Sequence, residues 1–390
     1  MHIAARRRPG LLLIVIAYLA FISLGLPDGL IGTAWPSIRS DFGQPLDALG
    51  GLLISFTLGY LLASSLSGWL LTHLGVGTLL ALSCAATAIS LIGYTLAPFW
   101  PLIVALGFVL GAGGGAIDAG LNVYATANFD ARALNWLHAC YGLGATAGPS
   151  LMVAVFAGGG GWRNGYLIVG GLQLALATCF VLTRRLWVQP ITPQEQKPRS
   201  VSLGATLGRP ATWISLAIFF FYTGLEATAG QWSYSLLVEV RGIVPGVAGL
   251  WVSLYWGALT AGRVFFGLVA GRVAPTLLLR ATMACSILGV ILLWFGGASW
   301  LSGLGLVVLG FSLAPIFPVL ILETPERMGA AHTNNAVGLQ IGVAVVGAAV
   351  LSALVGVFSR SISLEVLGPA LLGFGLLMIL LHELALRMRS

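Results

Sequence analysis

The chain has 390 residues, of which 58% are hydrophobic and only 8% are charged. Because a soluble domain carries about 25% charged residues, this composition excludes an ordinary soluble protein. The formal net charge is +7, and we expect the basic residues to orient the chain in a bilayer rather than to bind nucleic acid.

Twelve long apolar segments follow one another along the chain. A helix needs about 20 apolar residues to cross the hydrocarbon layer. Because lipid offers the backbone no hydrogen-bond partners, each span is expected to be helical, which predicts an all-α membrane protein. The run after Arg6, Arg7 and Arg8 is too long for a signal peptide and lacks a small-residue cleavage pattern. The predicted spans are 11–36, 48–71, 76–97, 101–127, 134–157, 162–187, 211–238, 245–270, 275–297, 300–322, 333–358 and 366–386.

The basic residues predict which side of the membrane each connection faces. Fourteen of them, from Arg6 to Arg389, fall on one side of the twelve-span order. Cytoplasmic connections carry the excess of Lys and Arg. We therefore expect an integral, multi-pass protein of the plasma (inner) membrane with both termini in the cytoplasm. The basic residues on the other side are Arg39, Arg163, Arg241 and Arg360.

The chain divides into two similar halves. The longest hydrophilic stretch carries Pro190, Pro193 and Pro198 and mixed charge, and it predicts a cytoplasmic linker at 189–210. This linker separates an N-terminal six-helix bundle at 1–188 from a C-terminal six-helix bundle at 211–390. Two pseudo-symmetric halves with one orientation, and a site near mid-membrane, are typical of secondary transporters. Residues repeat at a shift of 199 through five spans, as in Gly25 and Gly224, Gly50 and Gly249, Gly68 and Gly267, Gly111 and Gly310, Ala145 and Ala344, and Gly148 and Gly347.

Carboxylates interrupt three of the spans, at Asp28, Asp118 and Glu226. An ionised carboxylate in hydrocarbon is costly, so a charge at that depth usually faces a polar cavity and takes part in function. Asp118 and Asn122 are four residues apart and share one helix face. We predict that Asp28 and Asp118 exchange protons and that Asn122 contacts a solute. The alternatives are an Asp118 that only bonds a neighbouring helix and an Asp28 that is hydrated near the outer interface.

Glu226 lies near the centre of the seventh span and is followed by Gln231 and Trp232. Carboxylates accept hydrogen bonds from several hydroxyl groups, which suits a polyol. The alternative is an ion pair with a basic residue. Only Arg263 lies within a span, near the cytoplasmic end of the eighth, so we expect no direct pair. We predict that Glu226, Gln231 and Trp232 contact the solute.

Five further polar or aromatic residues are predicted to contact the solute. His138 and Tyr141 are three apart on the fifth span and face one way, and Gln340 on the eleventh span aligns with Tyr141 in the repeat. Trp251 and Tyr255 are four apart on the eighth span, where flat rings suit the C–H face of a sugar. The alternatives are a helix–helix hydrogen bond for His138 and an interfacial aromatic belt for Trp251 and Tyr255.

Two motifs carry a family resemblance. The fourth span reads Asp118-Ala-Gly-Leu-Asn122, and the fifth reads Leu134-Asn135-Trp-Leu-His138-Ala-Cys-Tyr141-Gly142. With Asp28 and Glu226, they resemble the fucose–proton symporter and sugar-permease-like branch of the major facilitator superfamily, and the wider resemblance covers essentially the whole chain. It implies two six-helix bundles that move a small solute by alternating access. The loop after the second span departs from the superfamily's Gly-x-x-x-Asp-Arg-x-Gly pattern, because it reads Gly68-Trp-Leu-Leu-Thr72-His73-Leu-Gly75 and lacks the acid and the bases.

We predict proton-coupled symport of a sugar or similar polyhydroxylated solute, by a monomer in the lipid bilayer. The first alternative is proton-coupled export of amphipathic or drug-like compounds, which Gly144-Ala-Thr-Ala-Gly148-Pro149 favours. The second is a membrane sensor or scaffold that does not transport. The sequence shows no catalytic constellation, metal-ligand spacing or nucleotide-binding loop, so we expect no enzyme activity and no cofactor. The four cysteines lie within spans and indicate no disulfide framework.

Overall fold

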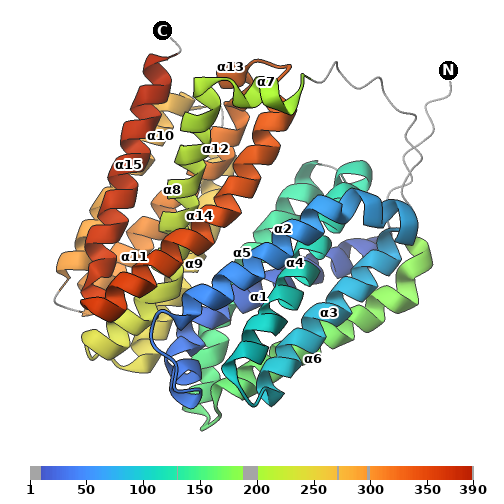
Figure 1. Cartoon of the computed structure of the whole chain (residues 1–390), viewed down its shortest axis with the longest axis vertical. Coiled ribbons are helices and arrows are strands. Elements are labelled where there is room, and N and C mark those ends of the chain that lie inside the picture. The colour runs from blue at the N-terminus through green and yellow to red at the C-terminus, as the bar shows by residue number, and fades with distance from the viewer. Residues whose placement is uncertain (1–9, 130, 188–200, 270–271, 297–298, 389–390) are drawn as a thin grey trace. The chain divides into compact units, whose positions relative to one another are not determined.

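The computed structural model describes residues 10–129, 131–187, 201–269, 272–296 and 299–388 (Figure 1). Within these ranges the chain forms helices and their connections, without a strand. The first half contains α1 (Leu11–Asp41), α2 (Ala48–Leu74), α3 (Val76–Leu96), α4 (Trp100–Asn128), α5 (Ala131–Ala157), α6 (Trp162–Thr183) and η1 (Arg184–Leu186). The second half contains α7 (Leu203–Leu207), α8 (Pro210–Ser235), η2 (Leu236–Val240), α9 (Pro245–Val269), α10 (Pro275–Phe295), α11 (Ser299–Leu313), α12 (Ile316–Leu322), α13 (Thr324–Met328), α14 (Thr333–Ser361), η3 (Leu364–Val366) and α15 (Leu367–Arg387).

The structure confirms the all-α fold and the twelve spans. Twelve helical segments of the described chain are long and apolar enough to cross a membrane. The tenth is made of α11 and α12, which are separated by Ala314 and Pro315. A break is expected there, because proline has no N–H to donate to the helix ladder. The first helix continues past the predicted end at residue 36 to Asp41.

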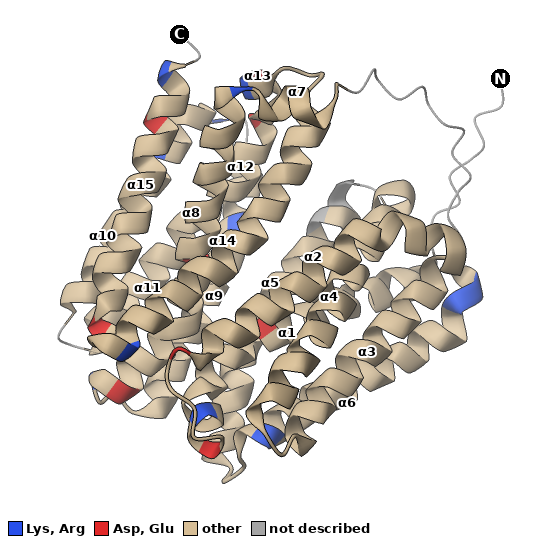
Figure 2. Ribbon diagram, in the orientation of Figure 1, with Lys and Arg blue, Asp and Glu red and all other residues tan. Residues whose placement is uncertain are grey.

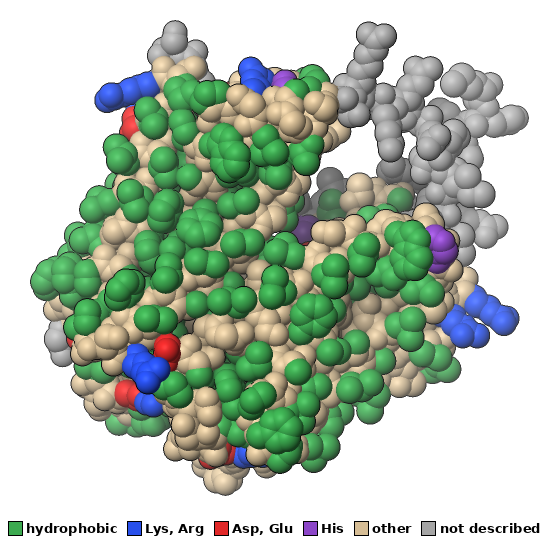
Figure 3. All heavy atoms as spheres, in the orientation of Figure 1, with side chains coloured by type: hydrophobic (Ala, Val, Ile, Leu, Met, Phe, Trp, Pro, Cys, Tyr) green, Lys and Arg blue, Asp and Glu red, His purple; other side chains and the backbone are tan. Residues whose placement is uncertain are grey.

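The surface of the helices is apolar, and the charges lie mostly at the helix ends. Figure 2 shows few Lys, Arg, Asp or Glu side chains along the middle of the ribbons. Figure 3 shows hydrophobic side chains spread over the visible face of the helices. Exposed leucines such as Leu96, Leu182 and Leu322 are at least 73% exposed. Such surfaces suit contact with lipid tails rather than water, and the chain fits an integral, multi-pass membrane protein.

The helices pack into two compact units. Unit 1 falls within Met1–Leu30, Ser40–Phe42 and Ser55–Pro193, and unit 2 falls within Ile31–Arg39, Gly43–Ile54 and Gln194–Ser390. The chain therefore passes from unit 1 to unit 2 inside α1 and returns to unit 1 at Ser40–Phe42. It enters unit 2 again at Gly43 and goes back to unit 1 at Ser55, inside α2. The linker predicted at 189–210 lies largely outside the described residues, and the bundle boundaries at 188 and 211 stay predictions.

Glycines bring the helices of unit 1 into backbone contact. A Cβ on Gly25 of α1 would lie 2.1 Å from the carbonyl oxygen of Tyr141 in α5. A Cβ on Gly59 of α2 would lie 2.0 Å from that of Phe108 in α4. Small residues let membrane helices approach this closely. α3 packs against both α4 and α6 (Figure 1).

Unit 2 is built around α8, which packs against α14 and α15. A Cβ on Gly347 of α14 would lie 2.3 Å from the carbonyl oxygen of Phe220 in α8. Parts of α1 and α2 join this unit through the same kind of contact. A Cβ on Gly32 of α1 would lie 2.9 Å from the carbonyl oxygen of Gln231 in α8.

Candidate functional site

Asp118 is held by two hydrogen bonds inside unit 1. Tyr60 of α2 donates its hydroxyl to Asp118 Oδ2 at 2.5 Å. Asn122, one turn along α4, donates its Nδ2 to Asp118 Oδ1 at 2.9 Å. The shared face that the sequence predicted for Asp118 and Asn122 therefore brings the two side chains into contact. All three residues are half-buried.

Asp28 has a similar arrangement on α1. Tyr141 of α5 donates its hydroxyl to Asp28 Oδ2 at 2.5 Å. Gly25 and Gly29 position this bond, because their missing side chains let the backbones of α1 and α5 touch. Among the described residues neither Asp28 nor Asp118 forms an ion pair.

His138 lies one turn before Tyr141 on α5, and its side chain is exposed. Its ring meets the ring of Phe21 edge to face, with the centroids 5.6 Å apart. Unit 1 thus carries five of the predicted polar site residues on α1, α4 and α5: Asp28, Asp118, Asn122, His138 and Tyr141.

Glu226 is the carboxylate of unit 2, and it is surrounded by partners. Tyr222, one turn earlier on α8, donates its hydroxyl to Glu226 Oε2. Arg263 Nη2 of α9 lies 3.6 Å from Glu226 Oε1, and the Tyr255 hydroxyl donates to the Glu226 carbonyl oxygen at 2.7 Å. The expectation of no direct pair with Arg263 was wrong. Helical side chains point toward the N-terminus of their helix. Because Arg263 lies near the C-terminal end of α9 (Pro245–Val269), this direction leads back toward the middle of the helix.

The remaining predicted residues of unit 2 lie in different surroundings. Gln231 is buried, and its Oε1 has no hydrogen-bond partner. Trp232 is fully buried and donates its indole N–H to the Ser352 carbonyl oxygen at 3.0 Å. Trp251 packs against Gly303, where a Cβ would lie 1.9 Å from its ring. Their roles toward a solute stay predictions.

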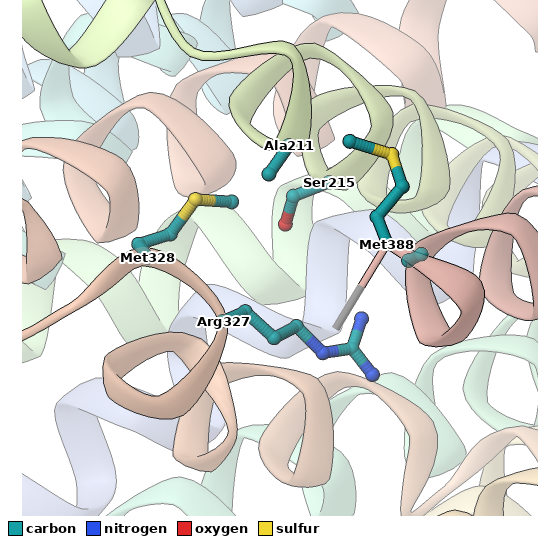
Figure 4. A pocket seen from close by; sticks show the side chains of 6 residues that line it. Ala211, Ser215, Arg327, Met328 and Met388 are labelled. Atoms are coloured by element: carbon teal, nitrogen blue, oxygen red, sulfur yellow. The ribbon is translucent and has the colours of Figure 1, made fainter. Parts of the chain in front are cut away.

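Gln340 is buried and fully engaged within unit 2. Its Nε2 donates to Ser215 at 2.7 Å, and Thr324 donates to its Oε1 at 3.1 Å. The structure shows no contact between Gln340 and Glu226. A small pocket next to Ser215 contains none of the predicted site residues (Figure 4). Its lining comes from α8, α13 and α15 and the residue after α15, namely Ala211, Ser215, Arg327, Met328, Ala385 and Met388.

Sequence reasoning missed two tyrosines that hold the carboxylates. Tyr222 could have been found, because it lies four residues before Glu226 and shares its helix face. Tyr60 carries no such signal, since its contact with Asp118 joins residues 58 positions apart on different helices.

Comparisons with known proteins agree with this architecture. The family described as Major Facilitator Superfamily matches residues 17–352. The glucose/mannose transporter GlcP of Bacillus subtilis (strain 168) is 22% identical over 351 residues, which are 88% of this chain and 86% of that protein. The sodium-dependent glucose transporter 1A of Mus musculus is 23% identical over 77% of this chain and 79% of that protein.

Solved structures are similar over nearly the whole chain. A bacterial homologue of the human lysosomal transporter Spinster superposes with a TM-score of 0.76 at 15% identity, over 97% of this chain and 96% of that one. The transporter FucP superposes with a TM-score of 0.64 at 17% identity, over 98% of this chain and all (100%) of that one. At these identities the likeness shows the fold.

Proposed function

Because this chain belongs to the Major Facilitator Superfamily, we propose that it is a secondary transporter that moves a sugar or similar polyhydroxylated solute together with protons, by alternating access. The family and the relatives are transporters, so the chain is a transporter and not an enzyme. The two relatives' names concern glucose or mannose, which supports a sugar as the solute. The predicted resemblance to the superfamily is confirmed.

One observation carries the coupling proposal: unit 1 holds two half-buried carboxylates that form no ion pair among the described residues. One proton on Asp28 or Asp118 therefore changes the net charge of that site. In unit 2 the charge of Glu226 is matched by Arg263, and a proton on Glu226 would leave a cation unpaired. We assign proton coupling to Asp28 and Asp118, and solute binding to Glu226.

Proton binding is linked to helix packing by the tyrosines. A protonated carboxyl gains a donor and loses acceptor capacity. Proton uptake by Asp118 therefore disturbs the bonds from Tyr60 and Asn122, of which the first joins α2 to α4. Proton uptake by Asp28 disturbs the bond that joins α1 to α5. Solute hydroxyl groups can replace the tyrosines as donors to the ionised carboxylates.

The test is solute-driven proton movement in proteoliposomes with a pH-sensitive dye. We expect a neutral sugar such as D-glucose or D-mannose, added outside, to make the external medium more alkaline. The name of the mouse relative includes sodium dependence, so the same uptake is measured with and without Na⁺. Uptake that needs Na⁺ and moves no protons contradicts proton coupling.

The residue-level test is Asp118→Asn. We expect this variant to exchange labelled solute across the membrane but to lose accumulation against a gradient, because residue 118 can no longer take up and release a proton. Asp41→Asn is the matched control, since Asp41 lies at the end of α1 in an ion pair with Arg163. Accumulation by Asp118→Asn at the wild-type level would remove Asp118 from the coupling role.

Export of amphipathic compounds is the second candidate, and its supporting motif has a structural explanation. A Cβ on Gly144 would lie 2.0 Å from the carbonyl oxygen of Ile22, and one on Gly148 would lie 2.8 Å from the backbone of Gly29. Both glycines therefore serve the contact between α5 and α1. Directional flux of a dye from loaded vesicles distinguishes export from uptake, and ligand binding without any flux indicates a sensor.

The setting of the transporter is part of the proposal. We place it in the plasma (inner) membrane as a monomer with both termini in the cytoplasm, because fourteen basic residues fall on that side of the span order. The end of unit 2 that carries residues 241–244 then faces outward.

A further inference from the structure

The indole N–H of Trp256 on α9 is buried without an acceptor. Trp256 is 6% exposed, and its Nε1 is one of eleven buried side-chain atoms in the described chain that lack a hydrogen-bond partner. A buried donor of this kind has lost its hydrogen bond to water and gained none in the protein, which costs free energy. Buried indole N–H groups usually find a partner, so this donor needs an explanation.

The Trp256 ring lies against α8, one turn past Glu226. A Cβ on Gly230 would lie 2.3 Å from Trp256 Cζ2 and 3.0 Å from its Cε2, the atom that carries the indole nitrogen. The edge of the ring next to the nitrogen is therefore seated on Gly230, where only glycine leaves room for it. Gly230 follows Glu226 by four residues, so the two positions share one helix face.

Trp256, Thr260 and Arg263 are spaced by four and three residues, so they share one face of α9. We call these three residues the α9 polar face. Exposure increases along it, from 6% for Trp256, through a half-buried Thr260, to 33% for the Arg263 side chain. A charged side chain within a span faces the bundle interior or a water-filled cavity rather than lipid. The α9 polar face is therefore closed at Trp256 and open at Arg263.

The open end of the α9 polar face meets the carboxylate of unit 2. Arg263 Nη2 lies 3.6 Å from Glu226 Oε1. Between the two ends, the Thr260 hydroxyl donates to the Trp256 carbonyl oxygen at 2.8 Å, which leaves the lone pairs of its own oxygen for another donor. Polar groups thus follow one another from the carboxylate to the indole N–H.

The orientation of the Trp256 ring is fixed from a second side by Tyr255. The two rings meet edge to face, with their centroids 5.1 Å apart and an angle of 71° between their planes. Tyr255 is itself tied to α8, because its hydroxyl donates to the Glu226 carbonyl oxygen at 2.7 Å. A donor that is already held in place binds a ligand without a further loss of conformational entropy.

We propose that Trp256 forms the closed end of the solute site at Glu226 and donates its indole N–H to a hydroxyl oxygen of a neutral sugar. The assignment rests on the proposed function. Glu226 accepts hydrogen bonds from hydroxyl groups at one end of the sugar, and Trp256 donates to an oxygen at the other end. Glu226 and Gly230 lie about 6 Å apart along the helix axis, a distance that a single sugar ring bridges.

Selectivity among deoxy sugars tests the donor. Uptake of a labelled sugar is inhibited by the parent sugar and by analogues that each lack one hydroxyl group. A site built to bond a hydroxyl group rejects the analogue without it. We expect Trp256→Phe to bind the parent sugar about three- to tenfold more weakly, the worth of one neutral hydrogen bond. It should also stop discriminating against one of the analogues that the wild type rejects. Wild-type affinity and selectivity in Trp256→Phe overturn the proposal.

Trp187→Phe is the matched control for the loss of ring volume. Trp187 is 3% exposed in unit 1, and its indole N–H donates to Thr183 Oγ1 at 3.0 Å. Both substitutions remove the same part of the ring, so a general packing loss would appear in each. We expect Trp187→Phe to keep the wild-type selectivity. The same change of selectivity in both variants overturns the proposal.

Gly230→Ala gives a second readout that leaves the indole N–H in the protein. Its Cβ would lie 2.3 Å from the ring, so the ring must move away from α8. We expect this variant to lose discrimination against the same analogue as Trp256→Phe. Gly246→Ala on α9 is the control, because an added Cβ there has no neighbour within 4 Å. Loss of discrimination against a different analogue contradicts the assignment.

Cysteine accessibility tests the closed end without reference to the solute. In a variant whose four cysteines are replaced by alanine, Thr260→Cys, Trp256→Cys or Val252→Cys is introduced, and reaction with a water-soluble methanethiosulfonate is timed. We expect residue 260 to react faster than residue 256, and Val252→Cys, one turn further along α9 and 1% exposed in the wild type, to stay unreactive. Reactivity at 256 no greater than at 252 overturns the proposal.

The outcomes separate this inference from the proposed function. A wild-type protein that transports none of the neutral sugars refutes the proposed function, and the donor role of Trp256 fails with it. Transport of a sugar by the wild type, with unchanged selectivity in Trp256→Phe, refutes the donor role alone. Slower reaction of the cysteine at 256 in the presence of a transported sugar supports both.

Discussion

Replacing Gly25 by alanine should separate α1 from α5 and break the hydrogen bond to Asp28. The new Cβ would lie 2.1 Å from the Tyr141 carbonyl oxygen, whereas ordinary contact begins at 3.4 Å. The two backbones must therefore move apart by about 1.3 Å, the difference between these distances. The same displacement would stretch the Tyr141–Asp28 bond from 2.5 Å to about 3.8 Å, beyond hydrogen-bond range.

The expected loss of unfolding free energy in Gly25→Ala has two parts. Overpacking costs about 1–3 kcal/mol, and a hydrogen bond to a charged group is worth about 1.5–3 kcal/mol. Thermal unfolding in detergent, followed by tryptophan fluorescence, measures their sum. Tyr141→Phe removes the hydrogen bond without overpacking the helices. The melting temperature of Gly25→Ala should therefore be lower than that of Tyr141→Phe. The control is Gly171→Ala on α6, where an added Cβ has no neighbour within 4 Å.

Transport provides the second measurement for Gly25→Ala. We expect Gly25→Ala and Tyr141→Phe to lose proton-coupled accumulation together, because both release Asp28 from α5. Gly171→Ala should accumulate solute as the wild type does. A Gly25→Ala protein that melts and transports like the wild type would show that α1 and α5 are not in backbone contact at this position.

Two further substitutions test the charges of unit 2. Arg327→Met breaks the ion pair with Glu323, in which both side chains are at most 6% exposed, and breaking a buried pair costs about 3–5 kcal/mol. Arg280→Met, which breaks an exposed pair with Glu383, should hardly change the melting temperature. Arg263→Gln should destabilise the protein by leaving Glu226 without its cation, and adding Glu226→Gln should restore part of the loss. Equal melting temperatures for Arg327→Met and Arg280→Met, or strictly additive losses for Arg263→Gln and Glu226→Gln, would count against these assignments.

Most of the fold could be predicted from the sequence, because in lipid the backbone must satisfy its hydrogen bonds within each helix. The apolar runs gave the twelve spans, and proline chemistry accounts for the break at Pro315. The passage of α1 from one unit to the other could not be predicted. It depends on which neighbour each glycine touches, and Gly29 touches α5 whereas Gly32 touches α8.

The candidate site was predictable only where its contacts are local. Asp118 and Asn122 are four residues apart, and helix geometry alone brings them together. The bond from Tyr141 to Asp28 spans 113 residues, so nothing in the local pattern indicates it. The pair between Arg263 and Glu226 was missed because depth was judged from the backbone position and not from the direction of the side chain.

The difference in charge balance between the two units has an electrical consequence. Moving one elementary charge through 100 mV changes the free energy by about 2.3 kcal/mol. In unit 2 the ion pair between Glu226 and Arg263 leaves little net charge for a voltage to act on. In unit 1 Asp28 and Asp118 form no ion pair among the described residues, so when both are ionised an inside-negative potential favours the conformation in which they face outward. Voltage would therefore assist the return of the empty carrier, and uptake of a neutral sugar with a proton would carry current.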